Sequence, residues 1–207
     1  ANHHFIQNRS VFDDYNVGQF ERDGIKKLNK LFTKNAIQIM VGGSGLYVNA
    51  ILNGLDQFPE VDPSVREQLN LELAENGLCS LQKKLKELDA ETYKEIAIDN
   101  PQRVIRALEI TIGSGFPFST FKNKPKEIRN FKSIKIGLKA DREILYNRIN
   151  KRVDIMIKNG LLHEVKNLHK YKYLNALQTV GYRELFSFLD GDITKEFAIS
   201  EIKKNSR

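Results

Sequence analysis

The stretch AIQIMVGGSGLYVNAIL, residues 36–52, decides the expected fold of this 207-residue chain. Residues 36–41 are apolar and rich in β-branched types, which is typical of a strand buried on both faces of a parallel sheet. Residues 42–45 then form a glycine-rich turn, and a helix begins at about Leu46. A second strand is predicted over 133–138, SIKIGL, so the predicted fold class is α/β.

The glycine-rich turn has two interpretations. A strand that ends in glycines before a helix presents free backbone N–H groups and the positive end of the helix dipole, and Ser44 adds a hydroxyl. These groups favour an anion. However, no lysine follows the last glycine, so the turn is not a P-loop. A tight corner with a purely structural role is the alternative.

The segments around this stretch are predicted to be helical. Asn16 begins an Asn-x-x-Gln capping pattern ahead of a helix that reaches about Lys34. Between residues 62 and 113, four amphipathic segments follow one another with no strand pattern. The first is predicted to start at Asp62-Pro63 and to end before Gly77, and the fourth to start at Asn100-Pro101 and to end at Gly113. A long helix is predicted over 142–158. We therefore predict an α/β core over 1–53 and 132–207, interrupted by a helical insertion domain over 54–131.

The composition limits the possible functions. Hydrophobic residues make up 41% of the chain and charged residues 29%, which is ordinary for a globular protein. No apolar run is long enough to cross a bilayer, so no membrane association is expected. One cysteine excludes an internal disulfide and fits the cytoplasm, and the histidine and cysteine spacing offers no metal site.

The net charge of +7 favours a polyanionic partner. Eight lysines and arginines against two acids lie between Phe121 and Arg142. A solvated basic surface without a partner is the alternative interpretation of this stretch.

The segment NPQRVIRALEI, residues 100–110, is the first candidate for phosphate recognition. Its buried stripe is predicted to contain Val104 or Ile105, then Leu108 and Ile112. The two arginines at 103 and 106 lie one turn apart on the remaining surface, where they and Gln102 could contact phosphates and base edges. A solvated face with charge pairing remains the alternative.

Two further segments carry arginines. In the helix over 142–158, Leu145, Ile149, Val153 and Met156 are predicted to be core, while Arg148 and Arg152 lie one turn apart and could bind one anion. In LQTVGYREL, residues 177–185, an aromatic residue beside an arginine could stack on an unpaired base. Helix capping and packing are the alternative there.

These motifs occur together in one known family. GGSGLY (42–47), DNPQRVIRALEI (99–110), RINKRVDIMIKNGLLHEV (148–165) and TVGYRELFSFLDGDI (179–193) closely resemble the bacterial tRNA dimethylallyltransferases. HHFI and YNVGQFERD, at 3–6 and 15–23, are similar to the family's segment before this glycine turn. The threonine usual within the turn is Ser44 here, which keeps the hydroxyl.

The resemblance implies transfer of a dimethylallyl group from dimethylallyl diphosphate to the N6 amine of the adenosine at tRNA position 37, beside the anticodon. It also implies a P-loop-kinase-like sheet core, with a helical insertion that binds the anticodon stem-loop. Mg²⁺ is the implied cofactor. The full-length protein is expected to be a monomer in the cytoplasm.

The resemblance also implies roles for individual residues. Ser44, Arg152 and, as its partner, Arg148 are expected at the reacting centre, the two arginines on the diphosphate. The residues expected to contact tRNA are Ser44, Arg66, Gln102, Arg103, Val104, Ile105, Arg106, Gln178, Thr179, Val180, Gly181, Tyr182 and Arg183.

Two family features do not occur in this sequence: the G-x-x-x-x-G-K-[ST] loop and the Asp-Ser-Arg-Gln-like segment with the general-base aspartate. The chain is therefore expected to be a fragment that is inactive alone, with the Mg²⁺ ligand in the missing loop.

Three alternatives stay open. An adenylate isopentenyltransferase would act on free nucleotides, although the helical insertion favours tRNA. A non-catalytic RNA-binding module would lack transfer altogether. A small-molecule P-loop kinase is disfavoured because the nucleotide-binding loop does not occur.

Overall fold

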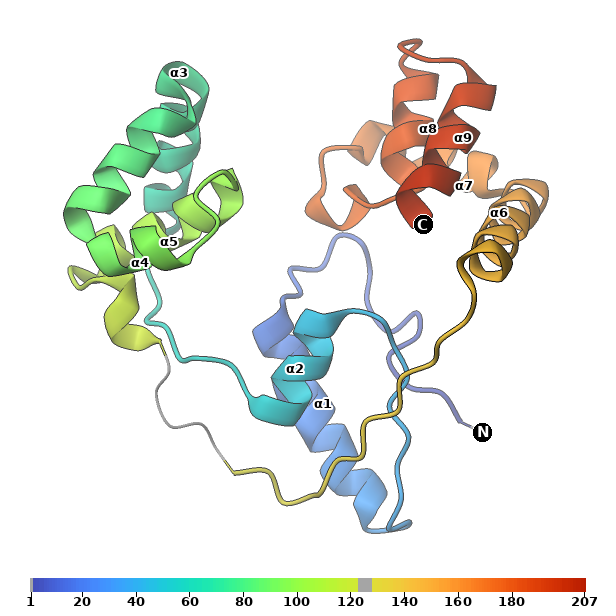
Figure 1. The fold of residues 1–207 in the computed structure, drawn as a ribbon, viewed down its shortest axis with the longest axis horizontal. Helices are drawn as coiled ribbons and strands as arrows, with labels where there is room; N and C mark the ends of the chain where they lie inside the picture. Colours follow the sequence, from blue (N-terminus) through green and yellow to red (C-terminus); the bar gives the residue numbers. More distant parts are fainter. Residues whose placement is uncertain (1, 123–127) are drawn as a thin grey trace. The chain divides into compact units, whose positions relative to one another are not determined.

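A computed structural model describes residues 2–122 and 128–207. The chain divides into two compact units. The central unit comprises residues 16–133, and the terminal unit comprises residues 1–15 and 134–207. The helices of both units carry the labels of Figure 1. The predicted boundaries of core and insertion stay a prediction, and residues 123–127 of the predicted basic stretch lie outside the described residues.

The predicted α/β class is wrong for the part of the chain that the structure describes, because its regular elements are all helices. Residues 36–41 and 133–138, predicted as strands, have no strand assignment. Their large apolar side chains are exposed, from 44% at Met40 to 98% at Leu138. A strand is completed by hydrogen bonds to a neighbouring strand, and neither segment forms a backbone ladder within the described residues.

The first helix pair of the central unit is α1 (Val17–Phe32) and α2 (Gly45–Asn53). The predicted capping box starts α1: the Asn16 side chain accepts from the backbone N–H of Gln19, and the Gln19 side chain accepts from that of Asn16. Gly24 of α1 is buried against Ile51 of α2, since a Cβ there would lie 2.4 Å from the Ile51 Cδ1. The helices therefore pack closely because position 24 has no side chain.

The second group in the central unit is α3 (Pro63–Leu88), α4 (Ala90–Glu95), α5 (Pro101–Ser114) and the 3₁₀ turn η1 (Phe118–Phe121) (Figure 1). The predicted break at Gly77 is a kink within α3, where φ is +72°. The side chains buried between these helices are Leu69, Leu81, Leu85, Val104, Ile105, Ala107 and Leu108.

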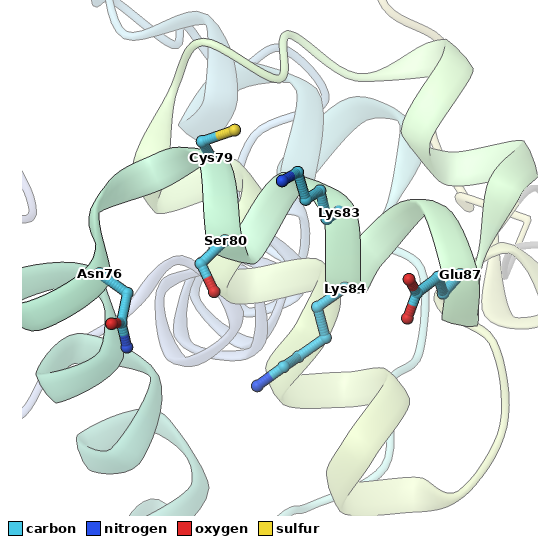
Figure 2. A pocket seen from close by; sticks show the side chains of 6 residues that line it. All are labelled: Asn76, Cys79, Ser80, Lys83, Lys84 and Glu87. Carbon is cyan, nitrogen blue, oxygen red and sulfur yellow. The ribbon is translucent and has the colours of Figure 1, made fainter.

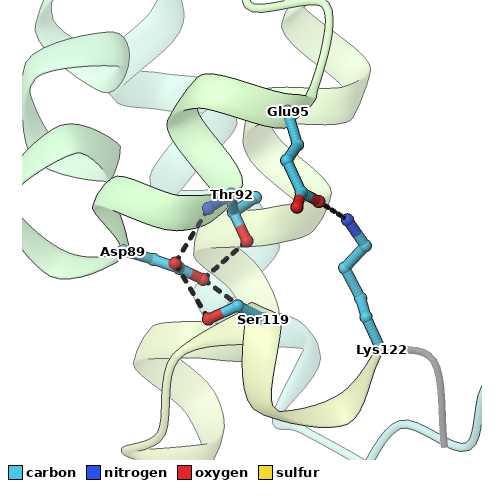
Figure 3. A network of polar contacts seen from close by, with 5 residues as sticks. All are labelled: Asp89, Thr92, Glu95, Ser119 and Lys122. Atoms are coloured by element: carbon cyan, nitrogen blue, oxygen red, sulfur yellow. Dashed lines mark hydrogen bonds and ion pairs between the residues drawn. The ribbon is translucent and has the colours of Figure 1, made fainter.

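One buried carboxylate fastens η1 to this group. Asp89, 4% exposed, accepts hydrogen bonds from the backbone N–H and the hydroxyl of Thr92, and from the same two groups of Ser119 (Figure 3). Lys122 forms an ion pair with Glu95 beside it. The segment after α5 is thereby held against α4.

The terminal unit contains α6 (Arg142–Lys158), α7 (Leu161–Leu168), η2 (His169–Tyr171), η3 (Asn175–Leu177), α8 (Tyr182–Leu189) and α9 (Lys195–Ser206). The predicted bounds of α6 are confirmed. Its predicted core residue Val153 is buried and Met156 packs beside it, but Leu145 is 42% exposed, so its predicted core position is wrong. The start of α6 is therefore less covered than its middle, where Val153 lies.

Candidate functional site

The site in the central unit is built around one buried carboxylate and two arginines. The Oε2 atom of Glu109 accepts from the Nη1 of Arg66 at 3.0 Å and from the Nη1 of Arg106 at 2.9 Å. The Glu109 side chain is 8% exposed, whereas those of Arg66 and Arg106 are 41% and 44% exposed. Two half-exposed guanidiniums therefore converge on the buried carboxylate of Glu109.

Local sequence brings these three residues together. Asp62 caps α3 by accepting from the N–H of Ser64, and Arg66 follows in the first turns. On α5, Arg106 and Glu109 are three residues apart, so both lie on one face. The Arg106 guanidinium also lies 5.7 Å from the ring centre of Phe58, which stacks on Phe118 at 4.7 Å. An aromatic platform thus supports one of the two arginines.

The remaining predicted residues of α5 divide by burial. Gln102 and Arg103 are exposed at the helix start, where the Asn100 side chain accepts from both of their backbone N–H groups. Val104 and Ile105 are fully buried in the core, so their side chains cannot reach a ligand. The predicted burial of Ile112 is wrong, because it is 43% exposed near the end of α5.

The glycine-rich turn is open at its surface. Ser44 is the N-cap residue of α2, yet its side chain makes no capping hydrogen bond, and it is exposed. A Cβ added to Gly42, Gly43 or Gly45 would meet nothing within 4 Å, and none of the three has a positive φ. Local backbone geometry and packing among the described residues therefore demand neither these glycines nor the hydroxyl.

The paired arginines of α6 belong to the terminal unit. Arg148 and Arg152 are both exposed, and within the described residues neither forms an ion pair. The nearby Asp154 pairs instead with Lys203 of α9, at 2.6 Å. Neither guanidinium is therefore paired with a carboxylate among the described residues, and binding of one anion by the two stays a prediction.

The predicted segment 178–183 leads into α8. Gly181 has a φ of +98°, and its N–H donates to Glu184 at 2.8 Å, so it makes the turn into the helix. The Tyr182 hydroxyl donates to Glu164, and burial together with that carboxylate raises the pKa of Tyr182 to about 12.

The other residues of this segment are less enclosed. Gln178 donates to the carbonyl of Lys172, Val180 packs on the core, and Thr179 and Arg183 are exposed. Thr179 and Arg183 therefore present exposed polar side chains, while the other residues of the segment hold the turn.

A shallow hollow on α3 contains none of the predicted site residues. It is lined by Asn76, Cys79, Ser80, Lys83, Lys84 and Glu87 (Figure 2). Lys84 forms an ion pair with Glu72, and Cys79 is exposed. None of these lining residues is buried, so the hollow does not compete with the arginine site.

Sequence reasoning missed Glu109 and Phe58 as parts of the site. The spacing of Arg106 and Glu109 by three residues was a usable signal for the first. Nothing local pointed to Phe58, because its contact with Arg106 joins distant parts of the sequence.

Across the described residues, no three histidine, cysteine or acidic side chains gather as metal ligands would. Of the described helices, none has the length and apolar character needed to cross a membrane.

Comparisons with known proteins identify close relatives. A family model described as IPP transferase matches residues 1–207. The chain is 58% identical to a tRNA dimethylallyltransferase of Flavobacterium psychrophilum, and covers 69% of that protein. It is 60% identical to one from Christiangramia forsetii, and covers 68% of it. All of this chain is matched in both cases.

A solved structure is also similar. The full-length tRNA isopentenylpyrophosphate transferase of Bacillus halodurans superposes with a TM-score of 0.62 at 32% identity. The match covers 99% of this chain and 64% of that one. Sequence and fold comparisons therefore point to the same group of enzymes.

Proposed function

The chain belongs to the IPP transferase family, and from this premise we propose that it acts in the transfer of a dimethylallyl group to tRNA. The acceptor is the N6 amine of the adenosine at position 37, and the donor is dimethylallyl diphosphate. The observation that carries this function is the identity of 58–60%, over the whole chain, to proteins named for that activity. A cytoplasmic site of action, with no membrane partner, belongs to the same proposal.

The helices α3 and α5 are proposed as the tRNA-binding surface. Arg66, Arg103 and Arg106 present exposed guanidiniums, which suit phosphate oxygens, and Gln102 can reach base edges. For Val104 and Ile105 only the backbone could take part, since both side chains are buried. The unpaired bases of an anticodon loop are where proteins read RNA sequence best.

The segment 178–183 is proposed as a further tRNA contact. Thr179 and Arg183 supply its exposed polar side chains, while Gln178, Val180, Gly181 and Tyr182 shape the turn that presents them.

Ser44, Arg148 and Arg152 are proposed to act at the reacting centre. As the amine attacks the allylic carbon, the C–O bond to diphosphate breaks and negative charge grows on the leaving group. The proton lost by the amine passes to a general base, which the family supplies from a segment that does not occur in this sequence. The guanidiniums of Arg148 and Arg152 can bind that charge. The Ser44 hydroxyl and the N–H groups at the start of α2 are free to position the donor or the acceptor base.

Mg²⁺ is proposed as the cofactor of the family's reaction, where it would help to neutralise the diphosphate. The described residues do not fit a protein-held Mg²⁺ site, because no group of three or more candidate ligands occurs among them. No residue described here is therefore assigned as its ligand.

The function is tested by competition. The full-length gene product is incubated with dimethylallyl diphosphate, Mg²⁺ and an anticodon stem-loop, with AMP added as a second acceptor. Modified stem-loop and unmodified AMP are the expected products. Preferential modification of AMP would show an adenylate isopentenyltransferase, and binding of the stem-loop without transfer would show an RNA-binding module.

A further inference from the structure

Glu109 is the feature of the central unit that the proposed function leaves unexplained. Its carboxylate is buried on α5, and both of its ion pairs go to exposed arginines proposed to contact tRNA. Burying a carboxylate is costly unless cations and hydrogen bonds compensate. A side chain placed at such a cost either joins the helices or holds the arginines for a ligand.

We propose that Glu109 is a positioning residue, which orients Arg66 and Arg106 as a two-armed clamp for one backbone phosphate of the anticodon stem-loop. The proposal rests on the proposed function, because it requires RNA to bind this surface. It adds a residue that does not itself touch RNA.

The charges support a clamp. Two guanidiniums on one carboxylate leave one net positive charge at the surface, enough to attract a phosphate. Each arginine uses one Nη1 on Glu109, and a guanidinium carries five N–H donors in a fixed fork. Donors therefore remain on both side chains after the carboxylate is satisfied.

Pre-organisation supplies the energetic reason. A free arginine loses about 2 kcal/mol of rotamer entropy when it is fixed. Here Glu109 orients both side chains before RNA binds, and the Arg106 guanidinium also contacts the Phe58 ring. The entropic cost at binding is then smaller.

Replacing the carboxylate separates this role from simple electrostatics. Glu109→Gln makes the protein more positive by one charge, so charge alone predicts tighter binding of a polyanion. The clamp predicts the reverse, because an amide holds two guanidiniums poorly. We expect Glu109→Gln to weaken the binding of an anticodon stem-loop about tenfold, measured by fluorescence anisotropy at one fixed salt concentration.

The matched control is Glu91→Gln, at an exposed position of α4 in the same unit, which makes the same charge change. It should leave binding unchanged or slightly tighter. Titration to stoichiometry, with far-ultraviolet circular dichroism, corrects each variant for any unfolded fraction.

A double-mutant cycle excludes a merely structural role. When Arg66→Ala and Arg106→Ala are already present, Glu109→Gln should have no further effect on affinity. An equal loss in both backgrounds would overturn the proposal, as would unchanged or tighter binding by Glu109→Gln alone. Absence of stem-loop binding by the unaltered protein would overturn the proposed tRNA surface itself, and the clamp with it.

Two further measurements keep the test decisive. If Glu109→Gln does not fold, Arg106→Lys replaces it, because lysine keeps the charge but lacks the fork, and it must weaken binding similarly. In transfer assays with the full-length gene product, Glu109→Gln should raise KM for the stem-loop and leave kcat and the KM for dimethylallyl diphosphate unchanged. A fall in kcat alone would contradict a positioning role.

Discussion

The Ser44 hydroxyl is exposed, and it makes no capping hydrogen bond to the helix that follows it. We expect Ser44→Ala to change the free energy of unfolding by less than about 0.5 kcal/mol, since no capping bond is lost. Because a hydroxyl at the reacting centre would act in the transition state, kcat/KM for transfer should fall about tenfold or more. Ser44→Thr, which keeps the hydroxyl, is the control and should retain activity.

Thermal unfolding and steady-state kinetics on the same preparations check this prediction. If Ser44→Ala were less stable but its folded fraction kept full transfer activity, Ser44 would have only a structural role in the turn.

Asp89 gives a prediction about pH. Burial raises the pKa of its carboxyl, but the four hydrogen bonds from Thr92 and Ser119 outweigh burial and hold it below the ordinary value of 3.8. The native state therefore favours the carboxylate. The stabilisation is fully present above pH 3.8 and is lost as the pH falls below that value, through the lowered pKa.

We expect Asp89→Asn to destabilise the protein at neutral pH by about 1–3 kcal/mol, because an amide accepts fewer hydrogen bonds. The difference from the unaltered protein should shrink as the pH falls below 3.8. Urea unfolding across pH measures it, and Glu91→Gln is the exposed control. A difference that stays constant from neutral to acidic pH would contradict the ionised role of Asp89.

Single residues also show where sequence reasoning succeeds and where it stops. The exposed positions of Arg103 and Arg106 followed from helical spacing. The spacing predicted burial of Val104 or Ile105, and the structure buries both. The partner of Arg66 could not be found that way, because Glu109 lies 43 residues further along the chain. Ile112 was misplaced because periodicity does not reveal which part of a helix is covered.

At the scale of elements, Arg129 anchors α2. Its Nε donates to the carbonyl of Ile51 at 2.9 Å, and one Nη donates to that of Ala50 at 2.8 Å. Both carbonyls belong to the last turn of the helix, where they lack intrahelical partners or share them. The same guanidinium forms an ion pair with Glu21 of α1, and is only 11% exposed.

We expect Arg129→Ala to lower the free energy of unfolding by about 1–3 kcal/mol, since buried acceptors lose their donor. Arg129→Lys should recover only part of this loss, because an ammonium cannot span the same three acceptors. Lys132→Ala, exposed nearby, is the control for charge. Equal stability of Arg129→Ala and the control would exclude the anchoring role.

The exposed face of α5 gives a second prediction about a single helix, namely that it binds the stem-loop. Arg103→Ala should weaken binding of the stem-loop, and the dependence of log affinity on log salt should become shallower by about 0.7–0.9 if one phosphate contact is lost. Lys94→Ala, at an exposed position of α4, is the control for the loss of one positive charge. An unchanged affinity and slope would remove α5 from the tRNA surface.

Helix starts were the most predictable features, because a capping residue acts on the backbone only a few residues away. Asn16, Asp62 and Asn100 each mark a helix start that the structure confirms. Ends were less predictable: α5 runs past Gly113, which lies close to Val61, and ends at the left-handed Gly115.

At the scale of the whole molecule, the predicted sheet is the main error. The apolar runs at 36–41 and 133–138 have the composition of buried strands, yet their side chains are largely exposed. Composition reports what a segment would bury, whereas a strand also requires a neighbouring backbone. Family membership, by contrast, was predictable, because four motifs in a fixed order are far more specific than any one of them.

The most direct test of the account is dimethylallyl transfer to an anticodon stem-loop by the full-length gene product. Mass spectrometry of the nucleosides should show one dimethylallyl group on the N6 of adenosine 37, and none on a stem-loop with a purine that lacks the exocyclic amine at that position. A stem-loop that stays unmodified, under conditions in which a relative such as the Flavobacterium psychrophilum enzyme modifies it, would contradict the account.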